Sequence, residues 1–302
     1  MGAAQLSTDL PGLESLLRAT ASEVDALLDR LVPSDGGGLV AAMRYGLLGA
    51  GKRLRPFLLL ESAKLFDVPH PRALMVSAAL ECIHCYSLIH DDLPAMDDDD
   101  LRRGKPTVHK AFDEATAILA GDALQTLAFT LLTEPETHPD AAVRVELIAG
   151  LAEAAGKDGM AGGQMLDLSA SQGPKPPLED VMHMQAMKTG ALFRYACGAG
   201  AVLGRATSRD RAALRRYSDN IGLAFQITDD VLDVKSSAGT LGKATQKDAR
   251  AGKATYIDLL GLEGARSRSR ELVADAKEAL TPFGNRAATL INTAEFVIQR
   301  AN

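Results

Sequence analysis

The chain has 302 residues, a formal net charge of −6 at pH 7 and a sequence pI of about 5.6. This balance excludes a general basic field for nucleic acid, so an anionic substrate would have to be held by a local basic cluster. Apolar residues make up 46% of the chain and aromatic residues only 4%, which favours the packing of helices rich in Ala and Leu.

The same features predict where the protein works. The first ten residues lack the charged and then apolar pattern of a signal peptide. No uninterrupted apolar run reaches the roughly 18 residues that span a bilayer. Three cysteines, an odd number without a secretory context, favour reduced thiols. We therefore expect a cytoplasmic protein with no membrane span and no nucleic acid partner.

Apolar residues recur three and four positions apart along most of the chain, which predicts helices. In chain order the predicted helices are 13–31, 39–48, 54–66, 73–89, 115–132, 141–155, 160–170, 178–203, 211–234, 257–279 and 285–300. Short turns rich in Gly and Pro separate them, and none resembles an interdomain linker. We expect one all-α domain over residues 1–302, a bundle of about ten or more helices. Residues 236–253, rich in Gly and Lys, are predicted to form a mobile flap within it.

Two runs of aspartate carry the strongest functional signal. Their members are Asp91, Asp92 and Asp97, then Asp229, Asp230 and Asp233. Each run follows an apolar stretch, where clustered carboxylates repel one another and are costly to desolvate without a cation. Mg²⁺ is the economical compensator, because it takes oxygen ligands and shares them with substrate phosphates.

The two runs differ in spacing. Asp229 and Asp233 are four residues apart and share one face of a helix. Asp91 and Asp97 are six apart, and a straight helix would place them on different faces. Because Pro94 disfavours continuation of the helix, we expect the chain to break there and to bring Asp97 back towards Asp91.

Basic residues form clusters that match the acidic runs. They are Lys52, Arg53 and Arg55; Arg102 and Arg103; Lys188; and Lys243, Lys247 and Lys253 in the predicted flap. Beside two metal-binding runs, these side chains are predicted to be diphosphate ligands, Arg through forked donors and Lys as a point charge.

Three further features lie within predicted helices. Thr189-Gly190 predicts a local kink that frees a carbonyl dipole to face positive charge. Gln226 is a single polar group on an apolar face, and it is either a core amide bonded to backbone or a site residue. Cys82 and Cys85 are expected in the core, whereas His84, two turns before Asp92, is expected to face the same cavity as Asp92.

Together these motifs resemble those of the head-to-tail trans-prenyl diphosphate synthases, and the resemblance covers most of the chain, from the Gly51–Pro56 segment to Tyr256. The resemblance is carried by the two aspartate runs, Gly51–Pro56, Lys188–Gly190, Phe225-Gln226 and Leu241–Lys243. The spacing Asp-Asp-x-x-x-x-Asp in the first run, and Tyr86 five residues before Asp91, resemble the bacterial farnesyl diphosphate synthases. Ala50 is a small departure, because the family often has a second Gly there.

The resemblance implies an isoprenoid synthase fold around a central cavity, and a homodimer. It also implies condensation of isopentenyl diphosphate with dimethylallyl and geranyl diphosphate to (E,E)-farnesyl diphosphate, with release of diphosphate. Three Mg²⁺ ions, or Mn²⁺ instead, would hold the allylic diphosphate for ionisation.

The resemblance also implies roles for single residues. The implied metal ligands are Asp91, Asp92, Asp97, Asp229, Asp230 and Asp233. The implied ligands of the allylic substrate are Arg102, Lys188, Thr189, Gln226, Lys243 and Lys253. Those of isopentenyl diphosphate are Lys52, Arg55, His84 and Arg103. The implied catalytic set is Asp91, Asp92, Asp97, Lys188, Thr189, Gln226, Asp229 and Asp230.

Product length is predicted from depth. At 1.5 Å per residue, Tyr86 lies roughly 7–8 Å along the helix from Asp91, where its ring would floor the cavity and stop elongation at fifteen carbons. The small Ser87 beside it leaves a geranylgeranyl or longer-chain synthase open. A class I terpene cyclase needs no second diphosphate site, and a non-catalytic regulatory subunit would be expected to have lost carboxylates, so both are weaker alternatives.

Overall fold

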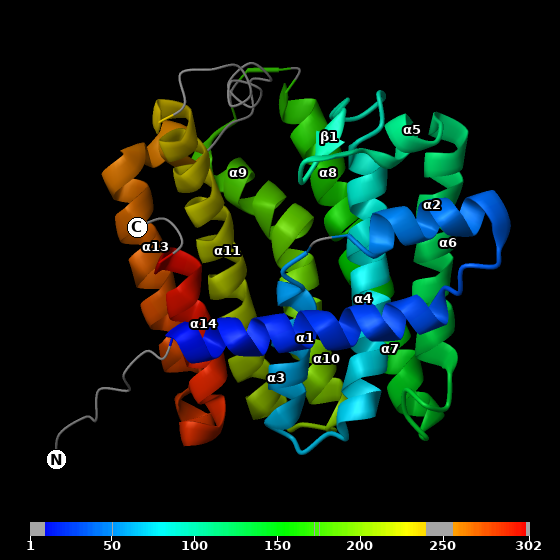
Figure 1. Ribbon diagram of the computed structural model, residues 1–302. Coiled ribbons are helices and arrows are strands. Elements are labelled where there is room, and N and C mark those ends of the chain that lie inside the picture. The colour runs from blue at the N-terminus through cyan, green and yellow to red at the C-terminus, as the bar shows by residue number, and fades with distance from the viewer. Residues whose placement is uncertain (1–9, 50, 172, 175, 240–255, 300–302) are drawn as a thin grey trace, which may run out of the picture. The chain divides into compact units, whose positions relative to one another are not determined.

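The structure is a computed structural model that describes residues 10–49, 51–171, 173–174, 176–239 and 256–299. Helices account for nearly all of the regular structure in these ranges (Figure 1). The predicted all-α class is therefore confirmed. Contacts group the chain into two compact units, which we name after the aspartate run in each. The Asp91 unit is Leu16–Ala152 with Gly198–Ala206, and the Asp229 unit is Met1–Ser15, Glu153–Cys197 and Thr207–Asn302. That the chain is one domain stays a prediction.

The Asp91 unit is built around one buried helix. Its elements in chain order are α1 (Leu10–Leu31, from Leu16), α2 (Gly37–Leu47), α3 (Leu54–Lys64), α4 (His70–Asp91), β1 (Leu101–Arg102), β2 (Lys105–Pro106), α5 (Val108–Ala111), α6 (Glu114–Thr133) and most of α7 (Ala141–Ala155). Helix α4 packs against α2, α3 and α6. Val76, Leu80 and Ile83, spaced four and three apart, have no exposed surface. This stripe places α4 in the core and brings its C-terminal end to the first aspartate run.

The Asp229 unit is organised along one long helix. Its elements are α8 (Met160–Ser171), α9 (Leu178–Gln185), the π-helical turn η1 (Ala186–Gly190), the start of α10 (Ala191–Leu203), α11 (Ser208–Gly239), α13 (Tyr256–Ala279), the 3₁₀ turn η2 (Thr281–Ala287) and α14 (Ala288–Gln299). Helix α11 lies along α13 and also contacts η1 and α14 (Figure 1). The buried Tyr217 hydroxyl donates to the Leu290 carbonyl at 2.8 Å, which fixes α11 to α14.

The sequence missed the short elements after the first aspartate run. The hairpin of β1 and β2 turns at Arg103 and Gly104, which have φ of 53° and 77°. Positive φ at both turn residues matches the twist of a two-residue hairpin. Two-residue strands are too short to show alternation, so the pattern contained no signal for them. Helix α11 extends to Gly239, so the first four residues of the predicted flap are helical, and residues 240–253 lie outside the described residues.

In the part of the chain that the structure describes, two helices, α4 and α6, are long and apolar enough to cross a membrane by length and composition alone. Core helices pass the same test, and 67% of the most apolar window of α4 is buried, against 39% for α6. This is weak evidence for a span, and we keep the prediction that the chain has none. The expected core position of Cys82 and Cys85 is confirmed, because both are buried, as is Cys197.

Two glycines of α10 make a matched test of packing in the Asp91 unit. A Cβ on Gly200 would lie 2.6 Å from the Ala63 backbone nitrogen of α3, whereas a Cβ on Gly198 would meet nothing within 4 Å. Gly200→Ala should therefore lower the free energy of unfolding by about 1–3 kcal/mol. Gly198→Ala should raise it by about 0.5–1 kcal/mol, because Ala loses less backbone entropy in a helix. Urea denaturation measures both, and equal effects would contradict the close approach of α10 to α3.

Candidate active site

The first aspartate run folds back on itself, as predicted. Helix α4 ends at Asp91, and the Asp97 amide donates to the Asp91 carbonyl at 2.9 Å. The Asp99 amide donates to the Asp92 carbonyl at 3.2 Å, and Pro94 is exposed in the turn between. The break therefore brings residue 97 beside residue 91, which a straight helix could not do.

Asp92 is held by a guanidinium. Its side chain is 3% exposed, and both carboxylate oxygens accept from Arg102 of β1, whose Nε lies 2.9 Å from each and whose Nη2 lies 2.7 Å from Oδ1. Burial acts to lower the pKa of Arg102, but the bonds to Asp92 outweigh it, so that the pKa is raised. This forked pair fixes the hairpin to the C-terminal end of α4. Asp91 is less buried than Asp92 and lies half-exposed at the end of α4.

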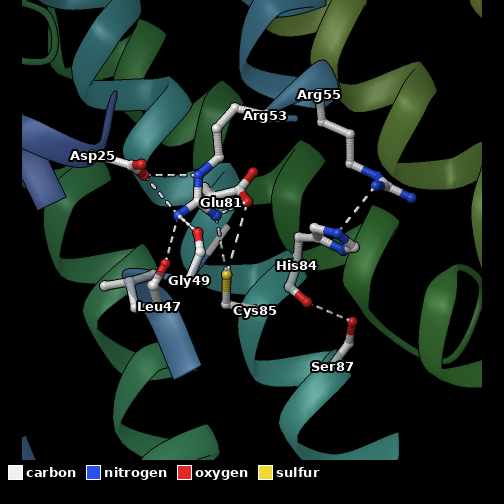
Figure 2. Close-up of polar contacts among 9 residues, drawn as sticks. All are labelled: Asp25, Leu47, Gly49, Arg53, Arg55, Glu81, His84, Cys85 and Ser87. Carbon is white, nitrogen blue, oxygen red and sulfur yellow. Dashed lines mark hydrogen bonds and ion pairs between the residues drawn. The ribbon is translucent and has the colours of Figure 1, made fainter. Parts of the chain in front are cut away.

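The basic segment before α3 presents its residues in different directions. Lys52 is exposed, Arg53 is buried and Arg55 is half-buried. The Arg55 Nη1 lies 3.3 Å from the His84 Nε2 (Figure 2). Burial, and then the charges of Arg55 and Arg103, lower the pKa of His84 well below its usual range. His84 is therefore neutral and accepts a hydrogen bond from Arg55, so the structure brings these two predicted diphosphate ligands together.

A small cavity lies beside Asp92 in the Asp91 unit. Its volume is about 70 Å³, far below the roughly 300–1,000 Å³ of typical ligand pockets. The cavity is lined by Cys85, Leu88 and Ile89 of α4 and by Asp92 just after it. The other lining residues come from α2, from Gly49 after it, and from the segment between Arg102 and Val108, including Arg103. His84 does not line this small cavity, and its side chain meets Arg55 instead. That His84 faces the same substrate cavity as Asp92 stays a prediction.

The second aspartate run lies on α11 and is joined to two other elements. The Thr189 hydroxyl donates to Gln226 Oε1 at 3.2 Å, and Gln226 Nε2 donates to Asp230 Oδ1 at 3.2 Å. The other oxygen of Asp230 accepts from the Tyr256 amide at 2.9 Å, at the first residue of α13. These two hydrogen bonds thus join Gln226 to side chains rather than to backbone groups, and its role as a site residue stays a prediction. The backbone of Asp233 continues α11, its side chain is outside the described residues, and Lys243, Lys247 and Lys253 lie outside them entirely.

The predicted kink before Gly190 is the π-helical turn η1. The carbonyl of Ala186 in this turn accepts from Arg194 Nη2 at 3.0 Å. That a carbonyl dipole of this turn faces developing positive charge stays a prediction. Lys188 Nζ lies 2.6 Å from Asp167 Oδ2 of α8. Helix α8 can approach so closely because residue 163 is glycine: a Cβ there would lie 2.2 Å from the Lys188 amide nitrogen.

Asp167 and Arg194 were missed by the sequence analysis. The available signal for Asp167 was a carboxylate among the small and apolar residues of segment 160–170, where the structure buries it. No spacing rule connects residue 167 to Lys188, because the two lie on separate elements. Arg194 follows η1 by one helical turn and resembles a surface cation in the sequence.

The carboxylates of the two aspartate runs are chemically suitable ligands for Mg²⁺, but those that the structure describes are not already arranged as a metal site. Within the described ranges, no group of three or more His, Cys, Asp or Glu side chains is arranged to hold a metal ion. Mg²⁺ commonly binds one or two carboxylates and completes its shell with water and substrate phosphate oxygens. A fold-back that places Asp97 beside Asp91 fits a site of that kind.

Comparison with known proteins places the chain in a family. Residues 38–282 match the polyprenyl synthetase family. The chain is 46% identical over 293 residues to the farnesyl diphosphate synthase of Escherichia coli K12, covering 94% of this chain and 97% of that protein. The chain belongs to the polyprenyl synthetase family. It is accordingly a prenyltransferase that uses isoprenoid diphosphates.

Other relatives of this polyprenyl synthetase differ in the product that their names give. The geranylgeranyl diphosphate synthase of Cyanophora paradoxa is 42% identical, over 92% of this chain and 93% of that protein. A solved structure described as an FPP/GFPP synthase from Zymomonas mobilis is 47% identical, with a TM-score of 0.86 over 95% of this chain and 99% of that one. The isoprenoid synthase fold is thereby confirmed.

Tyr86 and Ser87 of the polyprenyl synthetase lie on α4 before the first run. Tyr86 is buried, and its ring meets that of His90 edge-on at 5.7 Å. Burial and the charge of Asp91 raise the pKa of Tyr86, which shows that the ring is within electrostatic reach of the run. The Ser87 hydroxyl donates to the His84 carbonyl at 2.8 Å and is satisfied within its own helix. Their predicted role in chain length stays a prediction.

The Asp92–Arg102 pair can be tested by stability. Asp92→Asn removes the buried carboxylate charge that pairs with the half-buried Arg102 guanidinium, and we expect the free energy of unfolding to fall by about 3 kcal/mol. Asp100→Asn is the matched control, because Asp100 pairs with Lys110 in an exposed position and should contribute much less. Denaturant titration of both variants measures the difference, and an equal, small loss would show that Asp92 is not an anchor.

Proposed function

We propose that the chain is a farnesyl diphosphate synthase. It condenses isopentenyl diphosphate with dimethylallyl and then geranyl diphosphate, releasing diphosphate and forming (E,E)-farnesyl diphosphate. The observation that carries this proposal is the 46% identity, over nearly the full length of both chains, to the Escherichia coli farnesyl diphosphate synthase. The two acidic runs and the separate basic clusters support it, because the reaction needs one diphosphate that leaves and one that is kept.

Asp91, Asp97, Asp229 and Asp233 are the proposed carboxylate ligands of three Mg²⁺ ions, with Mn²⁺ as the alternative ion. The bound ions would neutralise charge on the leaving diphosphate of the allylic substrate. Asp92 and Asp230 were predicted as ligands too, and we revise their role. The oxygens of Asp92 accept from Arg102, and those of Asp230 accept from Gln226 and the Tyr256 amide. We assign both residues to anchoring the runs.

Isopentenyl diphosphate is proposed to bind to Lys52, Arg55, His84 and Arg103. The contact with His84 supports this role. A neutral imidazole can accept a hydrogen bond from Arg55, whereas a carboxylate in its place would add a negative charge that competes with the diphosphate. Arg103 stands at the hairpin turn, with its neighbour Arg102 fixed on Asp92. The site therefore combines exposed cations with a rigid support.

The allylic diphosphate is proposed to bind to Arg102, Lys188, Lys243 and Lys253. Asp167 supports Lys188 through their contact at 2.6 Å. Thr189 and Gln226 are proposed to turn their oxygen dipoles towards the allylic carbon as positive charge develops there. Asp230 sets the orientation of the Gln226 amide by accepting from its Nε2. Exclusion of water by an apolar surround and the flap of residues 236–253 would protect the cation until the alkene attacks.

We propose a cytoplasmic homodimer in which residues 1–302 form one domain. Three buried cysteines, an odd number, favour a reducing compartment. Helix α6 is apolar, but Ile118 and Leu119 are 43% and 56% exposed, and Phe112 just before it is 38% exposed. A second copy of the chain that covers this face would remove the apolar surface from water.

The direct test is incubation with isopentenyl diphosphate, Mg²⁺ and each allylic starter, with chromatography of the products. Farnesyl diphosphate as the main product supports the proposal. A twenty-carbon or longer product would favour the second candidate, a geranylgeranyl or longer-chain synthase, which the 42% identity to the Cyanophora paradoxa enzyme supports. No elongation of any starter would refute both.

Tyr86→Ala tests the length hypothesis. If the ring closes the cavity, its removal should shift the product from fifteen to twenty or more carbons, as read by the same chromatography. Ser87→Ala is the control, because it changes little volume at the adjacent position and should leave product length unchanged. Farnesyl diphosphate as the sole product of Tyr86→Ala would remove Tyr86 from the mechanism.

Asp91→Asn and Asp229→Asn test the metal proposal. Each should lower turnover by about three orders of magnitude, because several kcal/mol of charge stabilisation on the leaving group is lost. Circular dichroism should show an intact fold. Asp98→Asn, at an exposed position of the same run, should change turnover little, and Asn tolerates the left-handed φ of 49° found there. Near-normal turnover of either Asp91→Asn or Asp229→Asn would contradict the role of the runs.

A further inference from the structure

Arg53 lies between two proposed ligands of isopentenyl diphosphate, yet its own side chain turns into the protein. The side chain is 1% exposed, whereas Lys52 is exposed and Arg55 half-buried. Among the lysine and arginine side chains whose burial the structure describes, Arg53 is the only buried one. A guanidinium removed from water needs an acceptor for its donors, and its position is therefore set by those acceptors.

The guanidinium of Arg53 joins four segments of the Asp91 unit (Figure 2). Its Nε and Nη2 lie 2.9 and 2.7 Å from Asp25 of α1, and its Nη1 lies 2.5 Å from Glu81 of α4. Its Nη2 also donates to the Leu47 carbonyl at the end of α2, at 2.6 Å, and to the Gly49 carbonyl at 3.4 Å. One side chain thus fixes α1, the end of α2 and α4 to the start of α3.

These contacts also hold an uncommon backbone. Arg53 is the residue before α3 and has φ 47° and ψ 39°, the left-handed region that residues other than glycine adopt rarely. Such a conformation costs on the order of 1–3 kcal/mol and persists where surrounding contacts impose it. The backbone conformation of Arg53 sets the direction of the chain between Lys52 and α3, and therefore the positions of the Lys52 and Arg55 side chains relative to each other. In Figure 2 the side chains of Arg53 and Arg55 leave α3 in different directions.

Gly51 extends the same support to a third proposed ligand. A Cβ on Gly51 would lie 2.9 Å from Arg103 Nη1 and 3.4 Å from Arg53 Nη1. The backbone of residue 51 therefore lies against both guanidinium groups. A displacement of the Arg53 side chain would therefore also shift the backbone next to Lys52 and the neighbouring Arg103 guanidinium.

The carboxylates that hold Arg53 also offset the repulsion among the guanidinium groups near His84. Arg55, Arg103, Arg53 and Arg102 all act on His84, so four guanidinium groups lie within electrostatic reach of one ring. Before a diphosphate binds, these groups repel one another. Asp25 and Glu81 contribute two negative charges against the single positive charge of Arg53, and the excess offsets part of that repulsion.

We propose that Arg53 is a positioning residue for isopentenyl diphosphate. Its fork, held by Asp25, Glu81 and the Leu47 carbonyl, keeps Lys52 and Arg55 where they bind the diphosphate, and Arg53 itself does not touch the substrate. This role rests on the proposed function, because it requires that the ligand of Lys52 and Arg55 is isopentenyl diphosphate.

Arg53→Lys tests the role, because it keeps the charge and loses the planar fork. We expect the KM for isopentenyl diphosphate, and its dissociation constant measured by calorimetry without an allylic substrate, to rise by about tenfold or more. The KM for geranyl diphosphate should change by no more than about twofold, because loss of one site need not alter binding at the other. Lys52→Ala should give the same selective pattern.

Arg44→Lys is the matched control. Arg44 lies on α2 and joins it to α1 through Asp29 and the Val32 carbonyl, but it does not carry the segment before α3. The Arg44→Lys substitution should lower the Tm without changing the KM for isopentenyl diphosphate or for geranyl diphosphate. Should Arg53→Lys fail to fold, Asp25→Asn weakens the same fork from a side chain that is 40% exposed, and it should raise the KM for isopentenyl diphosphate selectively.

Two results would overturn the positioning role: an equal rise of both KM values, or a lowered Tm with both KM values unchanged. Failure of the proposed function is distinguishable from these. If the unchanged protein bound no isopentenyl diphosphate and elongated no starter, the proposed function would fail and the positioning role with it. If the unchanged protein elongates and Arg53→Lys acts unselectively, only the positioning role fails.

Discussion

A charged side chain that is buried on folding needs a partner of opposite charge, and this requirement sets the positions of the charged motifs in the structure. Asp92 is paired with Arg102, Lys188 with Asp167, and Arg53 with Asp25 and Glu81. Each pair joins an element that carries a motif to a neighbouring helix or hairpin. Breaking such a pair leaves an uncompensated charge, which costs more than the pair contributes in net terms. The positions of the substrate-binding residues therefore depend on partners that the chain itself supplies.

In three motifs this produces a division of labour between adjacent residues. In the first aspartate run the second carboxylate is buried against arginine, while the first stays half-buried at the end of α4. In the basic segment the middle cation is buried, while Lys52 before it is exposed. In the second run, Asp230 accepts from Gln226 and from the start of α13. One residue of each motif anchors it, and its neighbours are the proposed ligands of metal or diphosphate.

The sequence predicted the elements whose signal is local. Helical periodicity located most helices, Pro94 predicted the fold-back of Asp97, and Thr189-Gly190 predicted an irregularity in the helix, where the structure has the π-helical turn η1. It could not tell which carboxylate of Asp91-Asp92 is the anchor, because the two are chemically identical and only the tertiary contact with Arg102 separates them. For the same reason the sequence could not distinguish Arg53 from Lys52 and Arg55, since only tertiary contacts show that Arg53 is buried. The hairpin at Arg103 was too short for any periodicity, and the Asp167–Lys188 pair joins separate elements.

The division between anchor and ligand is tested most directly by the Mg²⁺ concentration that gives half-maximal turnover. It would be measured for the unchanged protein, Asp91→Asn and Asp92→Asn under one set of conditions. The account predicts that Asp91→Asn raises this concentration by about tenfold or more, since a carboxylate ligand is lost. Asp92→Asn should leave it within about twofold despite its lower stability. Equal shifts in the two variants would contradict the account, because both aspartates would then be metal ligands.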